Sequence, residues 1–142
     1  MLVRLLYASR AAAPLTDLVV GGILEQSRRH NPPHGITGIL CHDAERFIQV
    51  LEGGRDQVCE LYNTIVRDPR HAGVRILLYD DISERRFGGW AMGQVDIGRA
   101  NPALLLKYSE KAELNPFTCS GRASLSLLEE LIATGAVVSR IA

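Results

Sequence analysis

Three side chains with hydrogen-bonding chemistry each lie in a short motif of this sequence. Tyr7 lies in LLYASR, Asn31 in HNPPHGITGIL and Gln49 in FIQVLEG. A phenol can exchange a hydrogen bond with a carboxamide, and a second carboxamide can hold a flat heteroaromatic ring, because each amide carries donors and an acceptor. No hydrolase, kinase or metal motif accompanies them. The pattern favours a site that senses the electronic state of a ligand over one that breaks its bonds.

Each of these residues also has a purely structural interpretation. A tyrosine on an apolar strand is ordinarily part of the core, and Asn31 before two prolines is a typical helix terminator. Gln49 is harder to explain by packing alone, because an amide buried in an apolar strand needs hydrogen-bond partners.

Length and charge set the broad class of the protein. A chain of 142 residues predicts one domain, or one domain with a short helical extension. Sixteen basic and sixteen acidic residues give a formal net charge of zero, so neither a nucleic acid nor an anionic membrane surface is an expected partner. The apolar N-terminal stretch is interrupted by Arg4 and is too short for a signal peptide or a membrane span, which predicts a cytoplasmic protein.

The cysteines argue against a disulfide framework and against a metal site. There are three of them, Cys41, Cys59 and Cys119, and no CxxC spacing occurs. Their simplest interpretation is that of free thiols, buried where the surroundings are apolar.

The hydrophobic pattern predicts alternating strands and helices. Apolar runs indicate strands at 2–8, 35–42, 46–51, 74–79 and 90–95, and amphipathic stretches indicate helices at about 17–30, 55–67, 102–108 and 121–135. The order βαββαββ implies an α+β, ferredoxin-like fold with a mixed sheet and two helices on one face. We expect a boundary near Gly98, with a domain at 1–97 and a helical extension at 98–142 that packs on the other face.

In these motifs the chain resembles a BLUF domain, a flavin-binding sensor of blue light, over residues 2–97. The resemblance rests on the tyrosine of the first strand, the asparagine before GITG, GITGIL, FIQVLEG, DPRH at 68–71 and FGGWAMG at 87–93, all in order and at compatible spacing. The tail, with LLLKYSE and a final amphipathic helix, resembles that of short stand-alone BLUF proteins, which lack a fused enzyme.

The resemblance implies roles for the three residues. Tyr7 would donate an electron and a proton to the excited flavin and then recover them. Gln49 would lie between the Tyr7 hydroxyl and the N5/O4 edge of the flavin, and Asn31 would hold the carbonyl and N3 edge. Rotation or tautomerisation of Gln49 would exchange the group that faces the flavin and give a new hydrogen bond at O4 in the light state.

Further residues are implied to bind the cofactor. Ser27 and His30 would line the ring edge. Arg70 and His71 resemble the basic residues near the ribityl-phosphate side, and Asp68 would bind a ribityl hydroxyl. The implied cofactor is FAD, with FMN and riboflavin left open.

The sequence departs from the family at two places and carries a candidate route for the signal. His30 stands where many members have a second asparagine, and Thr64 stands where some have arginine or lysine, which puts strong phosphate anchoring in doubt. Trp90 and Met92 would share one face of a fifth, edge strand and transmit the signal, or would simply be core residues.

The implied function is that of a homo-oligomeric photoreceptor, not an enzyme, that acts through a separate effector protein. A cyclic-di-nucleotide phosphodiesterase or a response-regulator-like protein is the candidate effector. The alternative is a small ferredoxin-like enzyme of the acylphosphatase type, but Ala11-Ala12-Ala13-Pro14 follows Arg10 where such an enzyme needs a glycine-rich anion loop. A flavin oxidoreductase is disfavoured, because no nicotinamide-binding fingerprint occurs.

Overall fold

A six-stranded sheet in the order β4-β1-β3-β2-β5-β6 forms the centre of the protein. The computed structural model describes residues 1–134 and the backbone of residues 137–139. In chain order the strands and α-helices are β1 (Leu2–Ala11), α1 (Asp17–His30), β2 (Thr37–His42), β3 (Arg46–Gly54), α2 (Arg55–Arg67), β4 (His71–Ile82), β5 (Gly93–Asp96), α3 (Pro102–Tyr108), α4 (Gly121–Ala133) and β6 (Val137–Ser139). Short 3-10 turns lie at Pro32–His34 and Ile97–Arg99. The expected α+β, ferredoxin-like fold is confirmed.

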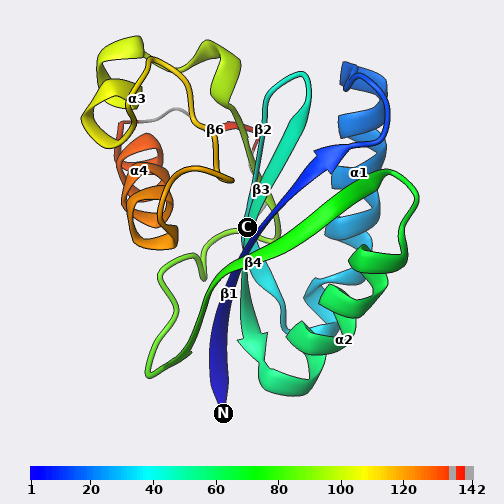
Figure 1. Ribbon diagram of the computed structural model, residues 1–142. Coiled ribbons are helices and arrows are strands. Elements are labelled where there is room, and N and C mark those ends of the chain that lie inside the picture. The colour runs from blue at the N-terminus through cyan, green and yellow to red at the C-terminus, as the bar shows by residue number, and fades with distance from the viewer. Residues whose placement is uncertain (135–136, 140–142) are drawn as a thin grey trace.

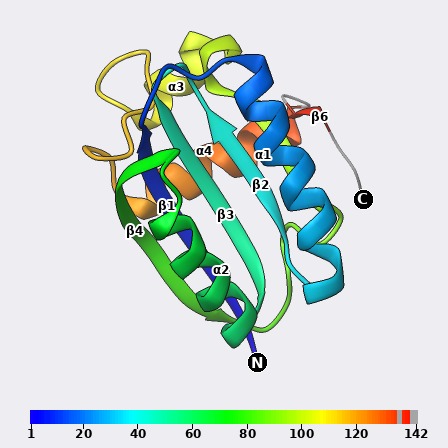
Figure 2. The ribbon, with the colours of Figure 1, turned by 90° about the vertical axis from the view of Figure 1, so that its right-hand side faces the viewer.

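Helices cover both faces of the sheet. Figure 1 shows α1 and α2 on one side and α3 and α4 on the other, and Figure 2 shows α4 behind the strands when α1 and α2 are in front. We call these sides the helix face and the tail face. The tail helices therefore pack on the sheet face that α1 and α2 leave open, as the sequence predicts.

Strand alternation separates two hydrophobic clusters, one on each face. On β3, Phe47 and Leu51 belong to the cluster that packs against α1 and α2, whereas Ile48 and Val50 belong to the cluster that packs against α3 and α4. Because β1 and β3 lie inside the sheet and are covered on both sides, nearly all of their side chains are buried.

Helix α1 begins and ends where local chemistry requires. The hydroxyl of Thr16 accepts a hydrogen bond from the backbone nitrogen of Val19 at 3.3 Å and so caps the start of α1. Pro32 and Pro33 follow Asn31 and stop the helix. The end of α1 is thus fixed at Asn31, where its backbone nitrogen donates to the Ser27 carbonyl.

The region around β5 differs from the sequence prediction. β5 covers Gly93–Asp96 rather than 90–95, and it is not an edge strand, because β6 pairs with its outer side. Trp90 and Met92 precede the strand, so the alternation rule does not place them on one face. Trp90 packs against the tail-face cluster and Met92 belongs to the helix-face cluster, which corrects the expectation that they share a face.

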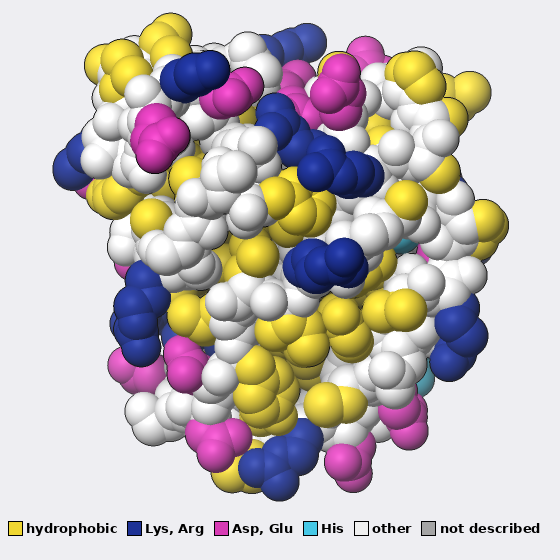
Figure 3. Space-filling model, viewed as in Figure 1, with side chains coloured by type: hydrophobic (Ala, Val, Ile, Leu, Met, Phe, Trp, Pro, Cys, Tyr) yellow, Lys and Arg dark blue, Asp and Glu magenta, His cyan; other side chains and the backbone are white. Residues whose placement is uncertain are grey.

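The strand at the opposite edge is longer than predicted and leaves apolar side chains exposed. β4 extends over His71–Ile82 rather than 74–79, and its pairing with β1 continues to both ends. Hydrophobic side chains gather over β4 in Figure 3. On this strand Ile76 and Tyr79 are 52% and 41% exposed. Among the described residues, no helix is long and apolar enough to cross a membrane.

The start of α4 lies directly against the backbone of β4, and a substitution tests this contact. A Cβ atom on Gly121 would lie 2.2 Å from the carbonyl oxygen of Leu77. We expect Gly121→Ala to lower the free energy of unfolding by about 1–3 kcal/mol, because the helix must move off the strand. Urea unfolding of the flavin-free protein measures the change.

Gly22→Ala is the matched control for this prediction. Gly22 lies inside α1, and a Cβ atom added there would meet no other atom within 4 Å, so alanine should raise stability by about 1 kcal/mol through helix propensity. Equal behaviour of the two variants would contradict close packing of α4 on β4.

Candidate functional site

Tyr7 and Gln49 form the centre of the site, because the antiparallel register of β1 and β3 places them directly opposite each other. The Tyr7 hydroxyl donates a short hydrogen bond to Oε1 of Gln49, and both side chains are buried. The amide nitrogen of Gln49 in turn donates to the sulfur of Met92 at 3.3 Å. One continuous chain of contacts therefore runs from Tyr7 through Gln49 to Met92.

The surroundings of Tyr7 keep its phenol protonated. Burial raises the pKa of Tyr7 well above its ordinary value, and the negative charge of Asp68 raises it further. The ring of Tyr62 lies edge-on to that of Tyr7, with 6.0 Å between centroids. A neutral phenol is a donor, which agrees with its hydrogen bond to Gln49.

His71 lies beside Tyr7. Its Nδ1 shares a hydrogen bond with the Ser9 hydroxyl at 2.7 Å, and its ring centroid is 4.6 Å from that of Phe47 and 6.2 Å from that of Tyr7. Burial lowers the pKa of His71, which favours the neutral imidazole. His71 therefore packs against Tyr7 and Phe47, whereas its sequence neighbour Arg70 lines a cleft on the helix face.

A cleft of about 120 Å³ on the helix face brings together most of the other predicted residues. It is lined by Ile23, Gln26, Ser27, His30, Asn31, Leu61, Thr64 and Arg70. A larger hollow of about 420 Å³ lies in the tail between residues 108 and 123, but it contains none of the predicted site residues. Side-chain chemistry, and not size, therefore identifies the cleft as the candidate site.

Asn31 supplies the observation that points to a ligand in this cleft. Its side chain is 1% exposed, and neither Oδ1 nor Nδ2 has a hydrogen-bond partner within the described part of the protein. A buried polar group without a partner costs about 1–3 kcal/mol. The Asn31 amide thus presents an unpaired acceptor, Oδ1, next to an unpaired donor, Nδ2. These two atoms fit the carbonyl and N3 edge of a flavin, where a donor lies next to an acceptor.

Arg70 and Asp68 form an ion pair beside the cleft. The Nη2 atom of Arg70 lies 2.6 Å from Oδ2 of Asp68 and donates to the Gln26 side chain at 2.9 Å. Their hydrogen bond raises the pKa of Arg70 and lowers that of Asp68, so both groups stay charged. A fixed guanidinium of this kind suits a phosphate or hydroxyl group of a ligand.

Sequence reasoning missed three residues of this region. Arg28 donates from Nε and Nη2 to the backbone carbonyl of Met92 at 3.1 and 3.0 Å and so ties α1 to the segment before β5. Tyr62 contacts Tyr7, and Gln26 orients Arg70. The only signal in the sequence was their place on the inner side of α1 or α2, which does not distinguish them from other polar helix residues.

Comparison with known proteins identifies the family. The family model for BLUF, described as sensors of blue-light using FAD, matches residues 2–93. The chain is 38% identical over 84 residues to the photoactivated adenylate cyclase subunit beta of Euglena gracilis, covering 59% of this chain and 10% of that protein. It is 34% identical over 97 residues to the blue light- and temperature-regulated antirepressor BluF of Escherichia coli (strain K12), covering 68% of this chain and 24% of that protein. The chain thus spans a small part of these relatives.

Solved structures agree over nearly the whole chain. BlsA in its photo-activated state superposes with a TM-score of 0.84 at 29% identity, covering 100% of this chain and 99% of that one. The dark state of BlrB, a BLUF protein, gives a TM-score of 0.74 at 33% identity, covering 94% and 96%. Klebsiella pneumoniae BlrP1 with FMN and cyclic diGMP gives 0.68 at 33% identity, covering 95% of this chain and 35% of that one.

These matches give no support to the acylphosphatase alternative. They agree with two features of the site: a buried phenol and carboxamide in hydrogen-bond contact, and a buried asparagine whose amide has no partner among the described residues. The chain belongs to the BLUF family, the sensors of blue light that use FAD.

Proposed function

We propose that this chain senses blue light through Tyr7 and Gln49 and passes the signal to a separate effector protein. The buried hydrogen bond from Tyr7 to Gln49 is the observation that carries the proposal. The amide of Asn31, which has no partner among the described residues, supports it. A flavin bound in the cleft supplies, when it absorbs blue light, the acceptor for an electron from Tyr7.

Tyr7 and Gln49 act as a pair in this proposal. Loss of an electron to the flavin would make the phenol strongly acidic, and its proton would leave along the hydrogen bond to Oε1 of Gln49. The amide then rotates or changes tautomer, and either change exchanges the donor and acceptor that Gln49 presents. Because Nε2 of Gln49 donates to the sulfur of Met92, the same change alters the contact with Met92. Both the electron and the proton would later return to Tyr7, so no net oxidation results.

The remaining cleft residues hold the cofactor. Asn31 would pair with the ring edge, and Ser27 and His30, which also line the cleft, would lie along it. Arg70, held by Asp68, would bind the ribityl-phosphate side. His71, on the neighbouring strand β4, would support the ring of Tyr7 and would also lie near the cofactor. FAD is the expected cofactor. FMN and riboflavin stay open, because Thr64 of the cleft adds no positive charge to anchor a phosphate.

The output side is proposed to lie in residues 98–142, outside the flavin-binding domain at 1–97. Met92 contacts Gln49 on the helix face and Trp90 packs against the tail-face cluster, which supports a path from the site to the tail. Exposed Ile76 and Tyr79 on the edge strand β4 support a homo-oligomer. We expect a cytoplasmic, non-enzymatic sensor whose effector is a cyclic-di-nucleotide phosphodiesterase or a response-regulator-like protein.

Tyr7→Phe tests the electron and proton donor. The variant keeps the ring that fills the core and removes the hydroxyl, so we expect flavin to be retained and the red-shifted light state to be absent. Absorption spectra before and after blue light measure this. Tyr62→Phe is the matched control, because Tyr62 contacts Tyr7 but makes no hydrogen bond to Gln49, and its photocycle should persist. A normal light state in Tyr7→Phe would refute the assignment of Tyr7.

Asn31→Ala tests the cofactor contact. Flavin loses the partner of its ring edge, so we expect affinity to fall by about 5- to 150-fold, equivalent to about 1–3 kcal/mol. Titration of flavin-free protein measures the affinity.

Two comparisons make this test specific. The control Asn63→Ala, at an exposed position on α2, should bind flavin normally. In the flavin-free state Asn31→Ala should be at least as stable as the parent protein, because the amide has no partner to lose there. Unchanged flavin affinity, or a large loss of stability without flavin, would assign Asn31 to the fold instead.

A further inference from the structure

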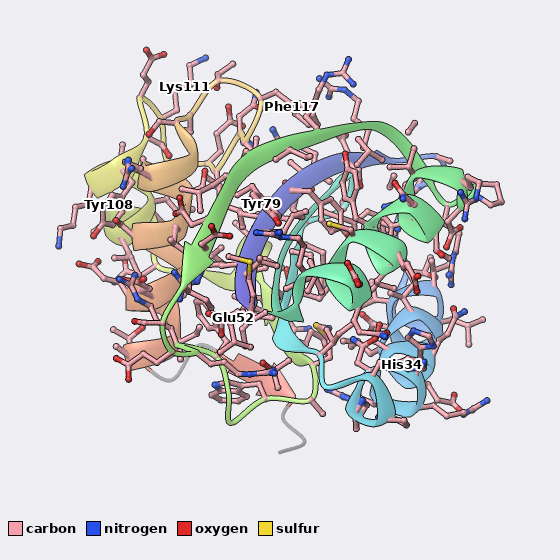
Figure 4. The ribbon with its side chains drawn as sticks, turned by 90° about the horizontal axis from the view of Figure 1, so that it is seen from below. His34, Glu52, Tyr79, Tyr108, Lys111 and Phe117 are labelled. Atoms are coloured by element: carbon pink, nitrogen blue, oxygen red, sulfur yellow. The ribbon has the colours of Figure 1, made fainter. Side chains whose placement is uncertain are left out.

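Glu52 is a buried charge that the light-sensing proposal does not use. It lies on β3 three residues beyond Gln49, and its side chain is fully buried. Figure 4 shows Glu52 in the interior, between the tail helices and the α1 and α2 side of the molecule. A buried carboxylate is costly unless it is paired and hydrogen-bonded, so its partners show what the position does.

One partner of Glu52 belongs to the sheet. Arg4 stands opposite Glu52 in the β1–β3 register, and its Nη2 and Nε atoms lie 2.7 and 2.8 Å from Oε2. The pair fixes the carboxylate to two central strands, so that Glu52 is a stationary anchor for whatever else it binds.

The other partners belong to the segment between β4 and β5, residues 83–92, which we call the connector. The backbone nitrogen of Phe87 donates to Oε1 of Glu52 at 2.6 Å, and that of Arg86 donates to Oε2 at 3.1 Å. The Arg85 side chain donates to the Glu52 carbonyl at 3.2 Å and to Thr37 at 3.0 Å. Two of these four hydrogen bonds go to the Glu52 carboxylate, so its side chain holds the backbone of the connector at residues 86 and 87.

The connector touches both faces of the protein. Near its end, Met92 contacts Gln49 through its sulfur and Arg28 through its carbonyl. Near the anchor, Phe87 is buried in the tail-face cluster, and Arg86 forms an ion pair with Glu129 of α4. The same ten residues thus link the candidate photochemical site to the tail helices.

The composition of the connector explains why an anchor is needed. Gly88 and Gly89 lie in its middle, and consecutive glycines make a backbone soft. The nitrogen of Trp90 donates to the carbonyl of Phe87 at 3.2 Å and closes a turn across them, and the Trp90 carbonyl accepts from Gly38 of β2 at 3.1 Å. A segment that is held by hydrogen bonds along its length transmits a displacement to the elements it contacts. A segment without such hydrogen bonds takes up the displacement by rotation about its own backbone dihedral angles.

We propose that Glu52 is the positioning residue of the signal path, because it anchors the connector so that a change at Met92 reaches α4. This rests on the proposed function of Tyr7 and Gln49. Removing the anchor leaves the flavin site intact, since Glu52 points to the tail face and Gln49 to the helix face. Removing the anchor also uncouples α4 from Met92, because a connector that is no longer held by Glu52 takes up a displacement of Met92 in its own dihedral angles.

Hydrogen exchange of α4 in the dark and under blue light, on the flavin-loaded full chain, tests the proposal. We expect light to change exchange over residues 121–133 in the parent protein. In Glu52→Gln that light-induced difference should fall at least fivefold, while the absorption shift and the dark exchange of α4 stay as in the parent. A merely structural role would change the dark exchange as well, because loosened packing exposes the helix without light.

Two further variants make the test decisive. Glu52→Gln leaves Arg4 buried without its counter-charge, so Arg4→Met combined with Glu52→Gln repeats the measurement without an unpaired charge. Asp81→Asn, which breaks an exposed ion pair with Arg55, is the matched control and should keep the full light response.

The outcomes separate this proposal from the one on which it rests. A parent-like light response of α4 in both Glu52 variants, or no light response of α4 in the parent, overturns the role of Glu52. Loss of the absorption shift in the Glu52 variants also overturns it, because Glu52 would then act at the flavin. Absence of the absorption shift in the parent protein contradicts the light-sensing function itself.

Discussion

The hydrogen bond between Tyr7 and Gln49 depends on one constraint, the antiparallel register of β1 and β3. A slip of one residue would turn either side chain to the opposite face and break the pair. The register is protected by what surrounds it: both strands lie inside the sheet, and apolar clusters cover both of their faces. Burial also keeps the Tyr7 phenol neutral, so the same packing that fixes the geometry fixes the direction of the bond.

Two buried polar side chains differ in the number of their hydrogen-bond partners. The difference distinguishes a residue that holds the fold together from one that binds a ligand. Glu52 has an arginine and two backbone nitrogens as partners, so its charge is accounted for by the protein. Asn31 has no partner for its amide among the described residues. In a folded core nearly every buried polar group is paired, and an exception at the end of α1, beside a cleft, is where a ligand belongs.

Much of the fold follows from local signals in the sequence, but the contacts between distant segments do not. The bounds of α2 follow from amphipathic periodicity, and capping chemistry restricts the start of α1 to Thr16 or Asp17, of which the structure has Thr16 as the cap. The opposed faces of Trp90 and Met92 could not be predicted, because a chain that leaves the strand no longer alternates. The contact of Arg28 with Met92 joins residues that are 64 positions apart, and no local pattern records it. Gln49 could be found because an amide in an apolar strand needs hydrogen-bond partners. Tyr7 and Asn31 could be told apart from ordinary core and helix-end residues only through the resemblance of their motifs to the BLUF family.

The central proposal for this protein is that light changes the hydrogen bonding of Gln49 while the flavin stays bound. The most direct test records absorption spectra of the purified parent protein and of Gln49→Leu, each loaded with flavin, before blue light, after it and during recovery in the dark. The account predicts a reversible red shift in the parent protein and none in Gln49→Leu at equal flavin occupancy. A reversible red shift of the same size in Gln49→Leu would contradict it.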